Sequence, residues 1–123
     1  MAYGYYYEPM ISYYDAFSAD LKITSFYNGQ FNIKTLATAG AQGLYSQAFF
    51  GNYYGSGQVF AYNRSADKVT LFDGVENTTP TATDVVTGGG RYLSVASNGS
   101  DTVMAYYDAA AGVLKVRPGP ALD

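Results

Sequence analysis

The sequence predicts an all-β protein built from a repeated four-stranded unit, and three observations support this prediction. Short runs rich in β-branched and aromatic residues alternate with clusters of Gly, Asn, Asp and Ser, and no long stretch keeps a helical period. Three segments of the chain can be laid over one another. Tyrosine is abundant, with 14 Tyr against 7 Phe and no Trp, and aromatic side chains fit the pleated surface of a strand.

The internal repeat consists of an aromatic strand, a polar turn residue and a second strand. Its three copies are Ile11-Ser12-Tyr13-Tyr14-Asp15 before Leu21-Lys22-Ile23, Val59-Phe60-Ala61-Tyr62-Asn63 before Val69-Thr70-Leu71, and Met104-Ala105-Tyr106-Tyr107-Asp108 before Leu114-Lys115-Val116. The turn residues are offset by 63 − 15 = 48 and 108 − 63 = 45 positions. A period of roughly 20–50 residues is typical of repeat architectures, in which one unit buries its apolar face only against its neighbours.

The alternation and the turn signals predict eleven strands along the chain. We expect them near residues 2–7, 9–14, 20–26, 31–37, 43–50, 57–63, 68–73, 81–87, 91–97, 102–107 and 112–117. All four prolines fall at strand edges or outside these strands, where a missing N–H is tolerated.

The segments that link the aligned hairpins also match, and they divide the strands into units. Leu44 to Ala48 aligns with Tyr92 to Ala96 at an offset of 92 − 44 = 48 positions. This alignment predicts that the second unit begins with strand 31–37 and the third with strand 81–87, so that the first unit lacks its first strand. Gly88-Gly89-Gly90 then forms the turn between the first two strands of the third unit, with positive φ values.

Four strands in about 45–48 residues are the dimensions of a β-propeller blade. Here the residues resemble a family: Pro9-Met10-Ile11-Ser12-Tyr13-Tyr14-Asp15 before Asp20-Leu21-Lys22, with Tyr106 to Lys115 matching it again, is similar to the repeat of sialidase-like bacterial β-propellers. In that family the Asp of an Asp-box fixes a turn, and Asp15, Asn63 and Asp108 occupy the corresponding positions, although the Ser-x-Asp-x-Gly-x-x-Trp form is absent. The resemblance implies one domain over 1–123, with repeats near 1–28, 29–76 and 77–123.

Three blades per chain do not close a ring, because each blade buries a face against each neighbour. Two chains supply six blades, the number typical of the sialidase-like family, so we expect a homodimeric six-bladed propeller. The missing first strand is expected to come from the partner's C-terminal tail, residues 117–123. Two alternatives remain open: a fragment of a longer chain, and a β-sandwich in which the repeat is an old duplication.

Composition excludes much chemistry. The formal net charge is −3 with no basic stripe, which disfavours nucleic-acid binding. The chain has no Cys and no His, and so lacks thiolates, the commonest zinc ligands and the commonest general base. We therefore expect no metal and no cofactor. No apolar run approaches the ~18 residues of a membrane span, and residues 1–8 do not have the organisation of a signal peptide.

Catalysis of the kind that the family resemblance implies is not expected. Sialidase-like enzymes use three arginines to hold the substrate carboxylate, but Arg64, Arg91 and Arg117 do not stand at matching repeat positions. Only Glu8 and Glu76 are available to support a tyrosine nucleophile, and neither has a motif. We expect a protein that is not an enzyme, and a sialidase-like hydrolase is the least favoured alternative.

The remaining signal is tyrosine beside Asn, Asp, Ser and Gln, which is the chemistry of sugar binding. The expected ligand-binding residues are Tyr14, Asp15, Tyr62, Asn63, Tyr107 and Asp108. For the three Asx residues the alternative is a structural turn role, and for the rings it is packing against the adjacent blade. The sequence thus predicts a non-catalytic, lectin-like module that binds glycans and a second copy of itself. The alternative is a structural subunit of a virion, fibre or surface layer, since tyrosine is enriched at protein interfaces.

Overall fold

The computed structural model describes residues 2–3, 9–27, 29–38, 40–50, 57–76, 79–98 and 101–119. Within these residues the regular secondary structure consists of strands: β1 (Ala2–Tyr3), β2 (Pro9–Asp15), β3 (Asp20–Tyr27), β4 (Gln30–Ala37), β5 (Gln42–Phe50), β6 (Gly57–Asn63), β7 (Lys68–Asp73), β8 (Thr81–Thr87), β9 (Arg91–Ser97), β10 (Thr102–Asp108) and β11 (Val113–Pro118). The all-β prediction is confirmed. The expected strand 2–7 is described only at β1, because 4–8 lie outside the described residues. No described segment forms a helix long and apolar enough to span a membrane.

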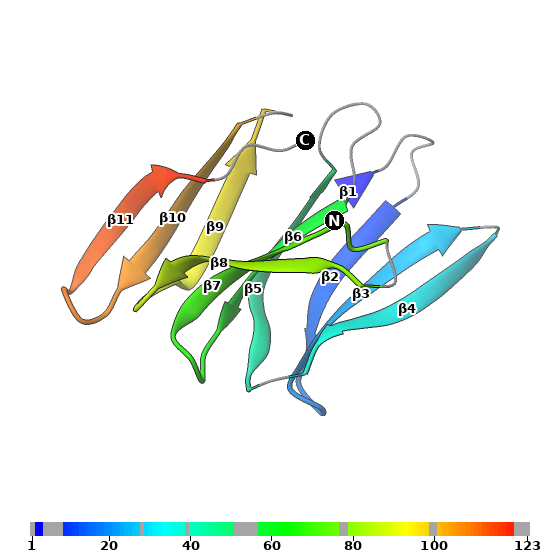
Figure 1. Cartoon of the computed structure of the whole chain (residues 1–123), viewed down its shortest axis with the longest axis horizontal. Coiled ribbons are helices and arrows are strands. Elements are labelled where there is room, and N and C mark those ends of the chain that lie inside the picture. The colour runs from blue at the N-terminus through cyan, green and yellow to red at the C-terminus, as the bar shows by residue number, and fades with distance from the viewer. Residues whose placement is uncertain are drawn as a thin grey trace.

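The described strands form three antiparallel sheets that follow the chain order. The first sheet runs β1-β2-β3-β4, the second β5-β6-β7-β8 and the third β9-β10-β11, and every neighbour in each sheet is also the neighbour in sequence. Figure 1 shows the second sheet in green between the first sheet (blue to cyan) and the third sheet (yellow to red). Each sheet is thus a simple up-and-down meander, and the chain crosses from one sheet to the next twice.

The first two sheets each end one strand later in the chain than predicted. Strand 30–37 closes the first sheet, because the short turn that contains Gly29 (φ 77°) folds it back onto β3, where Phe31 pairs with Phe26. In the same way β8 pairs with β7 and closes the second sheet. The expectations that the first unit lacks a strand and that 31–37 and 81–87 open new units are therefore wrong.

The short sheet is the third one, in which the outer edge of β11 has no fourth strand among the described residues. Arg117, the first residue of the tail expected to supply a strand to a partner, belongs to β11 and pairs with Met104 of its own chain; residues 120–123 lie outside the described part. Gly88–Gly90 is the crossover from the second sheet to the third and not a turn within a unit. The positive φ expected there is found at Gly88 (70°) and Gly90 (128°).

The sheets pack face to face, with one apolar cluster in each of the two gaps. Between the first and second sheets lie Met10, Leu21, Ile23, Ala48, Val59, Ala61, Phe72 and Val75. Between the second and third sheets lie Phe60, Tyr62, Val69, Leu71, Val86, Leu93, Val95, Met104 and Tyr106. The second sheet is therefore covered on both faces, and all seven residues of β6 are buried.

Two names describe this arrangement. The front face of a sheet is the one that bears the residues equivalent to Leu21, and the rear face bears those equivalent to Val59. The front face of the first sheet packs on the rear face of the second, and the front face of the second sheet packs on the rear face of the third. The same contact is therefore made twice within one chain, as expected of a repeat architecture.

Candidate ligand-binding site

The three repeated Asx residues each close the hairpin between their two strands. The backbone N–H of Phe17 donates to Asp15 Oδ1 (3.0 Å), that of Ala66 to Asn63 Oδ1 (3.1 Å), and that of Ala111 to Asp108 Oδ1 (3.1 Å). The fourth residue after each Asx has a positive φ: Ala19 (62°), Asp67 (50°) and Gly112 (67°). These contacts are those of a structural turn, the role favoured for short polar side chains at such positions.

Two of these turns also carry an ion pair across the hairpin. Lys22 Nζ lies 2.6 Å from Asp15 Oδ2, and Lys115 Nζ lies 2.7 Å from Asp108 Oδ2. The hydrogen bond from Lys22 holds the pKa of Asp15 below its ordinary value, and the bond from Lys115 does the same for the pKa of Asp108. The two lysines in turn have a raised pKa.

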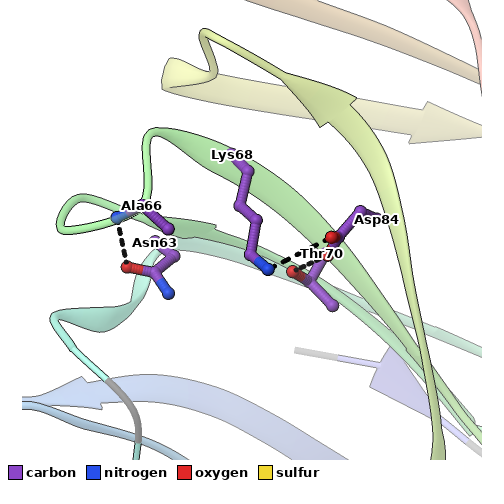
Figure 2. A network of polar contacts seen from close by, with 5 residues as sticks. All are labelled: Asn63, Ala66, Lys68, Thr70 and Asp84. Carbon is purple, nitrogen blue, oxygen red and sulfur yellow. Dashed lines mark hydrogen bonds and ion pairs between the residues drawn. The ribbon is translucent and has the colours of Figure 1, made fainter.

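The second sheet replaces this ion pair with a different network. Figure 2 shows Asn63 bonding the backbone of Ala66, while Asp84 of β8 accepts from both Lys68 (3.1 Å) and Thr70 (3.0 Å). Thr70 stands at the repeat position of Lys22 and Lys115. The ion pair of this sheet therefore joins β7 to β8, and Asn63 Oδ1 accepts from the turn backbone without a lysine partner at position 70.

The three expected tyrosines, Tyr14, Tyr62 and Tyr107, stand at one repeat position and differ in burial. Tyr62 is buried between the second and third sheets, and its hydroxyl donates to Asp67 Oδ1 at 2.7 Å. Tyr14 and Tyr107 are half-buried. Burial is the largest cause that raises the pKa of Tyr62, and the bond to Asp67 raises that pKa further.

Four tyrosine rings form a continuous row, which we call the tyrosine row: Tyr62, Tyr45, Tyr92 and Tyr107. The ring centroids are 6.2 Å apart for Tyr62 and Tyr45 within the second sheet, and 6.4 Å apart for Tyr92 and Tyr107 within the third. The 5.5 Å contact between Tyr45 and Tyr92 joins the two pairs across the gap between sheets. Tyr45 is 41% exposed and Tyr92 64% exposed, so the centre of the row faces solvent.

An unusual backbone presents these two exposed rings. Tyr45 (φ 53°) and Tyr92 (φ 58°) both have a left-handed backbone conformation. Each stands two residues after a glycine of positive φ, which is Gly43 (101°) for Tyr45 and Gly90 (128°) for Tyr92. Pairing of β5 with β6 is irregular here, and pairing of β9 with β10 shifts register between Ala105 and Tyr107. Bulges of this kind turn a side chain out of its normal direction, and strained tyrosines are kept where the surroundings hold them, often at functional sites.

Charged groups lie beside the buried end of the row. Arg91 and Asp67 are exposed, and the Tyr62 hydroxyl donates to the Asp67 carboxylate, while the Arg91 guanidinium acts in the opposite sense and lowers the pKa of that hydroxyl. The bond with Tyr62 raises the pKa of Arg91. The arrangement places a carboxylate and a guanidinium next to exposed aromatic rings, a combination that binds hydroxylated ligands with one apolar face.

The structure brings together two of the six expected site residues, Tyr62 and Tyr107, and it joins them through Tyr45 and Tyr92. Asp15, Asn63 and Asp108 are each engaged in the turn of their own sheet. Tyr45 and Tyr92 were not among the site residues expected from the sequence. Both tyrosines stand in a Gly-x-Tyr motif, at Gly43 to Tyr45 and Gly90 to Tyr92, with an offset of 92 − 45 = 47 positions. The motif alone does not single them out, since it also occurs at Gly4 to Tyr6 and Gly51 to Tyr53.

Other features of the described residues do not compete with this site. A hollow of ≈ 400 Å³ lies at the hairpin between β9 and β10, at the opposite end of those strands from Tyr92 and Tyr107. Among the described residues, no group of three or more Asp or Glu side chains is placed to hold a metal ion.

No family model matches the chain, and no curated protein or solved structure matches it either. The resemblance to sialidase-like propellers therefore rests on the repeat residues alone.

Proposed function

We propose that this chain is a non-catalytic glycan-binding module whose binding surface is the tyrosine row. The observation that carries the proposal is the contact between Tyr45 and Tyr92, two exposed rings 5.5 Å apart on adjacent sheets. Aromatic faces stack on the apolar faces of pyranose rings, and a row of rings offers successive sugar units a continuous platform. Arg91 and Asp67 supply a donor and an acceptor for sugar hydroxyls beside that platform.

The geometry favours a pre-formed site over one assembled on binding. The left-handed backbone at Tyr45 and Tyr92 is supported by Gly43 and Gly90, each of which packs tightly on the preceding sheet. A site held in place before the ligand arrives loses less conformational entropy on binding. No catalytic step is assigned to the chain, which has neither His nor Cys.

We further propose that the three sheets are successive blades of a β-propeller completed by a second copy, giving six blades. The support is the sequential antiparallel order in each sheet and the repeated front-to-rear packing. Tyr107 pairs with Leu114 on the front face of the third sheet, so this assembly would cover that end of the tyrosine row. The exposed centre of the row, Tyr45 and Tyr92, lies within one chain, so sugar binding there does not require the assembly.

A glycan array probed with the labelled chain tests the function. The native chain is expected to bind at least one glycan class, and calorimetric titration with the best glycan then gives its affinity. Tyr92→Ala removes a central ring and is expected to reduce the affinity at least tenfold, whereas Tyr92→Phe keeps the ring and most of the binding. Phe17→Ala is the matched control, because Phe17 is equally aromatic and fully exposed but lies in the turn between β2 and β3. An array without any bound glycan contradicts the proposal.

A second candidate function is that of a structural assembly subunit, and one specific observation favours it. The two outer faces of the stack expose large apolar side chains, among them Ile33 and Phe31 on the first sheet and Leu114 and Val116 on the third. Soluble monomers rarely keep such patches, and they mark interaction sites. Assembly into large polymers, with no sugar bound on the array, would support this candidate over the lectin-like one.

A further inference from the structure

The same repeat positions are buried in two sheets and exposed in the third. Leu21, Val69 and Leu114 are equivalent residues on the front faces of the three sheets, and their exposures are 0%, 0% and 72%. For Ile23, Leu71 and Val116 the exposures are 4%, 7% and 66%. In the first two sheets these side chains lie against the rear face of the next sheet. The front face of the third sheet has the same apolar character, and no next sheet covers it among the described residues.

The rear face shows the complementary pattern at the other end of the stack. Val59 and Met104, on the rear faces of the second and third sheets, are exposed by 0% and 1%, whereas their equivalent Ile11 on the first sheet is 37% exposed. The register of β2, β3 and β4 places Thr24 and Ile33 beside Ile11 on this face, and Phe31 and Phe26 continue it with rings 5.0 Å apart. The first sheet thus presents an apolar rear face, and the described part of the chain has no preceding sheet to cover it.

We infer that the front face of the third sheet in one copy binds the rear face of the first sheet in a second copy. This inference rests on the assembly proposed above. The partner is a second copy because this chain already makes that contact twice, front face to rear face, between its own sheets. Leu114 and Val116 take the places that Leu21 and Ile23 hold inside the chain, and Ile11 takes the place of Val59. Two copies in this arrangement form two identical contacts related by a twofold axis, with both apolar faces covered and the ring closed.

The contact is head-to-tail, and this distinguishes it from the two other ways in which apolar faces of identical chains meet. Contact between two front faces would bury Val116 in both copies and leave Ile33 exposed. Contact between two rear faces would do the reverse. Only the front-to-rear contact places Val116 and Ile33 at the same interface.

The test uses charged substitutions at residues that one chain alone leaves exposed, so that each variant keeps its fold. Val116→Glu alters the front face of the third sheet, and Ile33→Glu alters the rear face of the first; their native side chains are 66% and 69% exposed. Phe17→Glu is the matched control, since Phe17 is more exposed than either and lies in the β2–β3 turn, outside both faces. Circular dichroism and a cooperative urea transition confirm that each variant is folded.

Sedimentation equilibrium at micromolar concentration is expected to show dimers for the native chain and for Phe17→Glu. Val116→Glu and Ile33→Glu each shift the dissociation constant upward by at least tenfold. A mixture of the two variants recovers part of the dimer, because the intact front face of the Ile33→Glu chain meets the intact rear face of the Val116→Glu chain. Native mass spectrometry identifies this species as a heterodimer.

Three outcomes overturn the inference: a native chain that stays monomeric, a loss of dimer confined to one of the two faces, and a mixture in which no heterodimer forms. The glycan array separates this failure from failure of the sugar-binding proposal. Val116 and Ile33 lie outside the tyrosine row, so folded monomeric variants are expected to keep their sugar binding. A monomer that binds glycans contradicts the assembly alone, and a dimer that binds none contradicts the sugar-binding proposal alone.

Discussion

Gly90 lies so close to Val69 that a Cβ added to the glycine would fall 2.5 Å from Cγ2 of Val69. The preceding pair of sheets repeats this relationship, because a Cβ on Gly43 would fall 2.9 Å from the Cα of Leu21. Leu21 and Val69 are equivalent repeat positions, and each glycine begins the Gly-x-Tyr motif that presents an exposed tyrosine. The two glycines therefore set the distance between sheets and the direction of the tyrosine row together.

Gly90→Ala is expected to destabilise the fold far more than Gly88→Ala. Both residues have positive φ, but a Cβ at Gly88 meets nothing within 4 Å. Gly88→Ala thus carries only the left-handed backbone cost, about 1–2 kcal/mol, whereas Gly90→Ala adds an overpacking cost of about 2 kcal/mol. Urea unfolding measures both. Val69→Ala in the Gly90→Ala background is expected to recover part of the loss, and equal stabilities for the two glycine variants would contradict the close-packing argument.

Ala19→Gly is expected to stabilise the protein, and Gly112→Ala to destabilise it. The two residues occupy the same place in equivalent turns, with φ of 62° and 67°. A Cβ in this conformation costs about 1–2 kcal/mol, part of which the greater freedom of glycine in the unfolded chain offsets. We expect changes of about 0.5–1 kcal/mol in opposite directions in thermal or urea unfolding. Changes of the same sign would show that the turns are not equivalent.

Acid is expected to weaken the fold through Asp15 and Asp108. The lysine bonds depress the pKa of both carboxyl groups in the folded state, so the unfolded chain takes up protons first as the pH falls. The stability from these pairs is therefore present above an unfolded pKa of about 3.9 and is lost as the pH falls through the lower folded pKa. Unfolding by urea between pH 7 and pH 2.5 measures this slope.

Asp15→Asn with Asp108→Asn keeps the turn acceptor, as Asn63 does naturally, and removes both titrating groups. The double variant is expected to lose stability at pH 7 and to show a flatter acid dependence. The double variant Lys22→Gln with Lys115→Gln removes the other partner of each ion pair, and it is also expected to flatten the acid dependence of stability. An acid slope that stays at the native value in both double variants would rule out these ion pairs as its source.

Tyr62→Phe is expected to cost about 1–2 kcal/mol at pH 7, because the hydroxyl bonds a carboxylate and lies in a buried place. The raised pKa of Tyr62 means that the unfolded chain loses this proton first. The contribution is thus complete below an unfolded pKa of about 10 and falls as the pH rises beyond it. Unfolding at pH 7 and pH 10.5 tests this: Tyr62→Phe should lose less stability between the two than the native chain does.

Strand positions could be predicted from the sequence because they depend on local alternation and on turn residues. The spans of β6 to β9 match the expected 57–63, 68–73, 81–87 and 91–97. The grouping into sheets could not be predicted in the same way. It depends on whether a short linker folds back, as at Gly29, or crosses to the next sheet, as at Gly88 to Gly90, and both linkers are rich in glycine.

The turn role of Asp15, Asn63 and Asp108 followed from their residue types and their repetition. The tyrosine row did not, because alignment at an offset of 48 positions placed Leu44 opposite Tyr92. Strand pairing gives an offset of 47 instead, since Ala48 pairs with Val59 as its equivalent Val95 pairs with Met104, so Tyr45 is the true equivalent of Tyr92. Both tyrosines lie where the pairing of their strand is irregular. A bulge is a property of strand pairing and close packing, and a pattern of period two does not contain it.

The most direct test of the central claim is a two-dimensional NMR titration of the chain with ¹³C-labelled tyrosine rings, using the glycan selected on the array. Single Tyr→Phe variants assign the ring signals. We expect the signals of Tyr45 and Tyr92 to shift together along one binding curve, while that of Tyr13, on the rear face of the first sheet, does not move. Saturation of the chain with no change at Tyr45 and Tyr92, or with shifts confined to rings outside the tyrosine row, would contradict it.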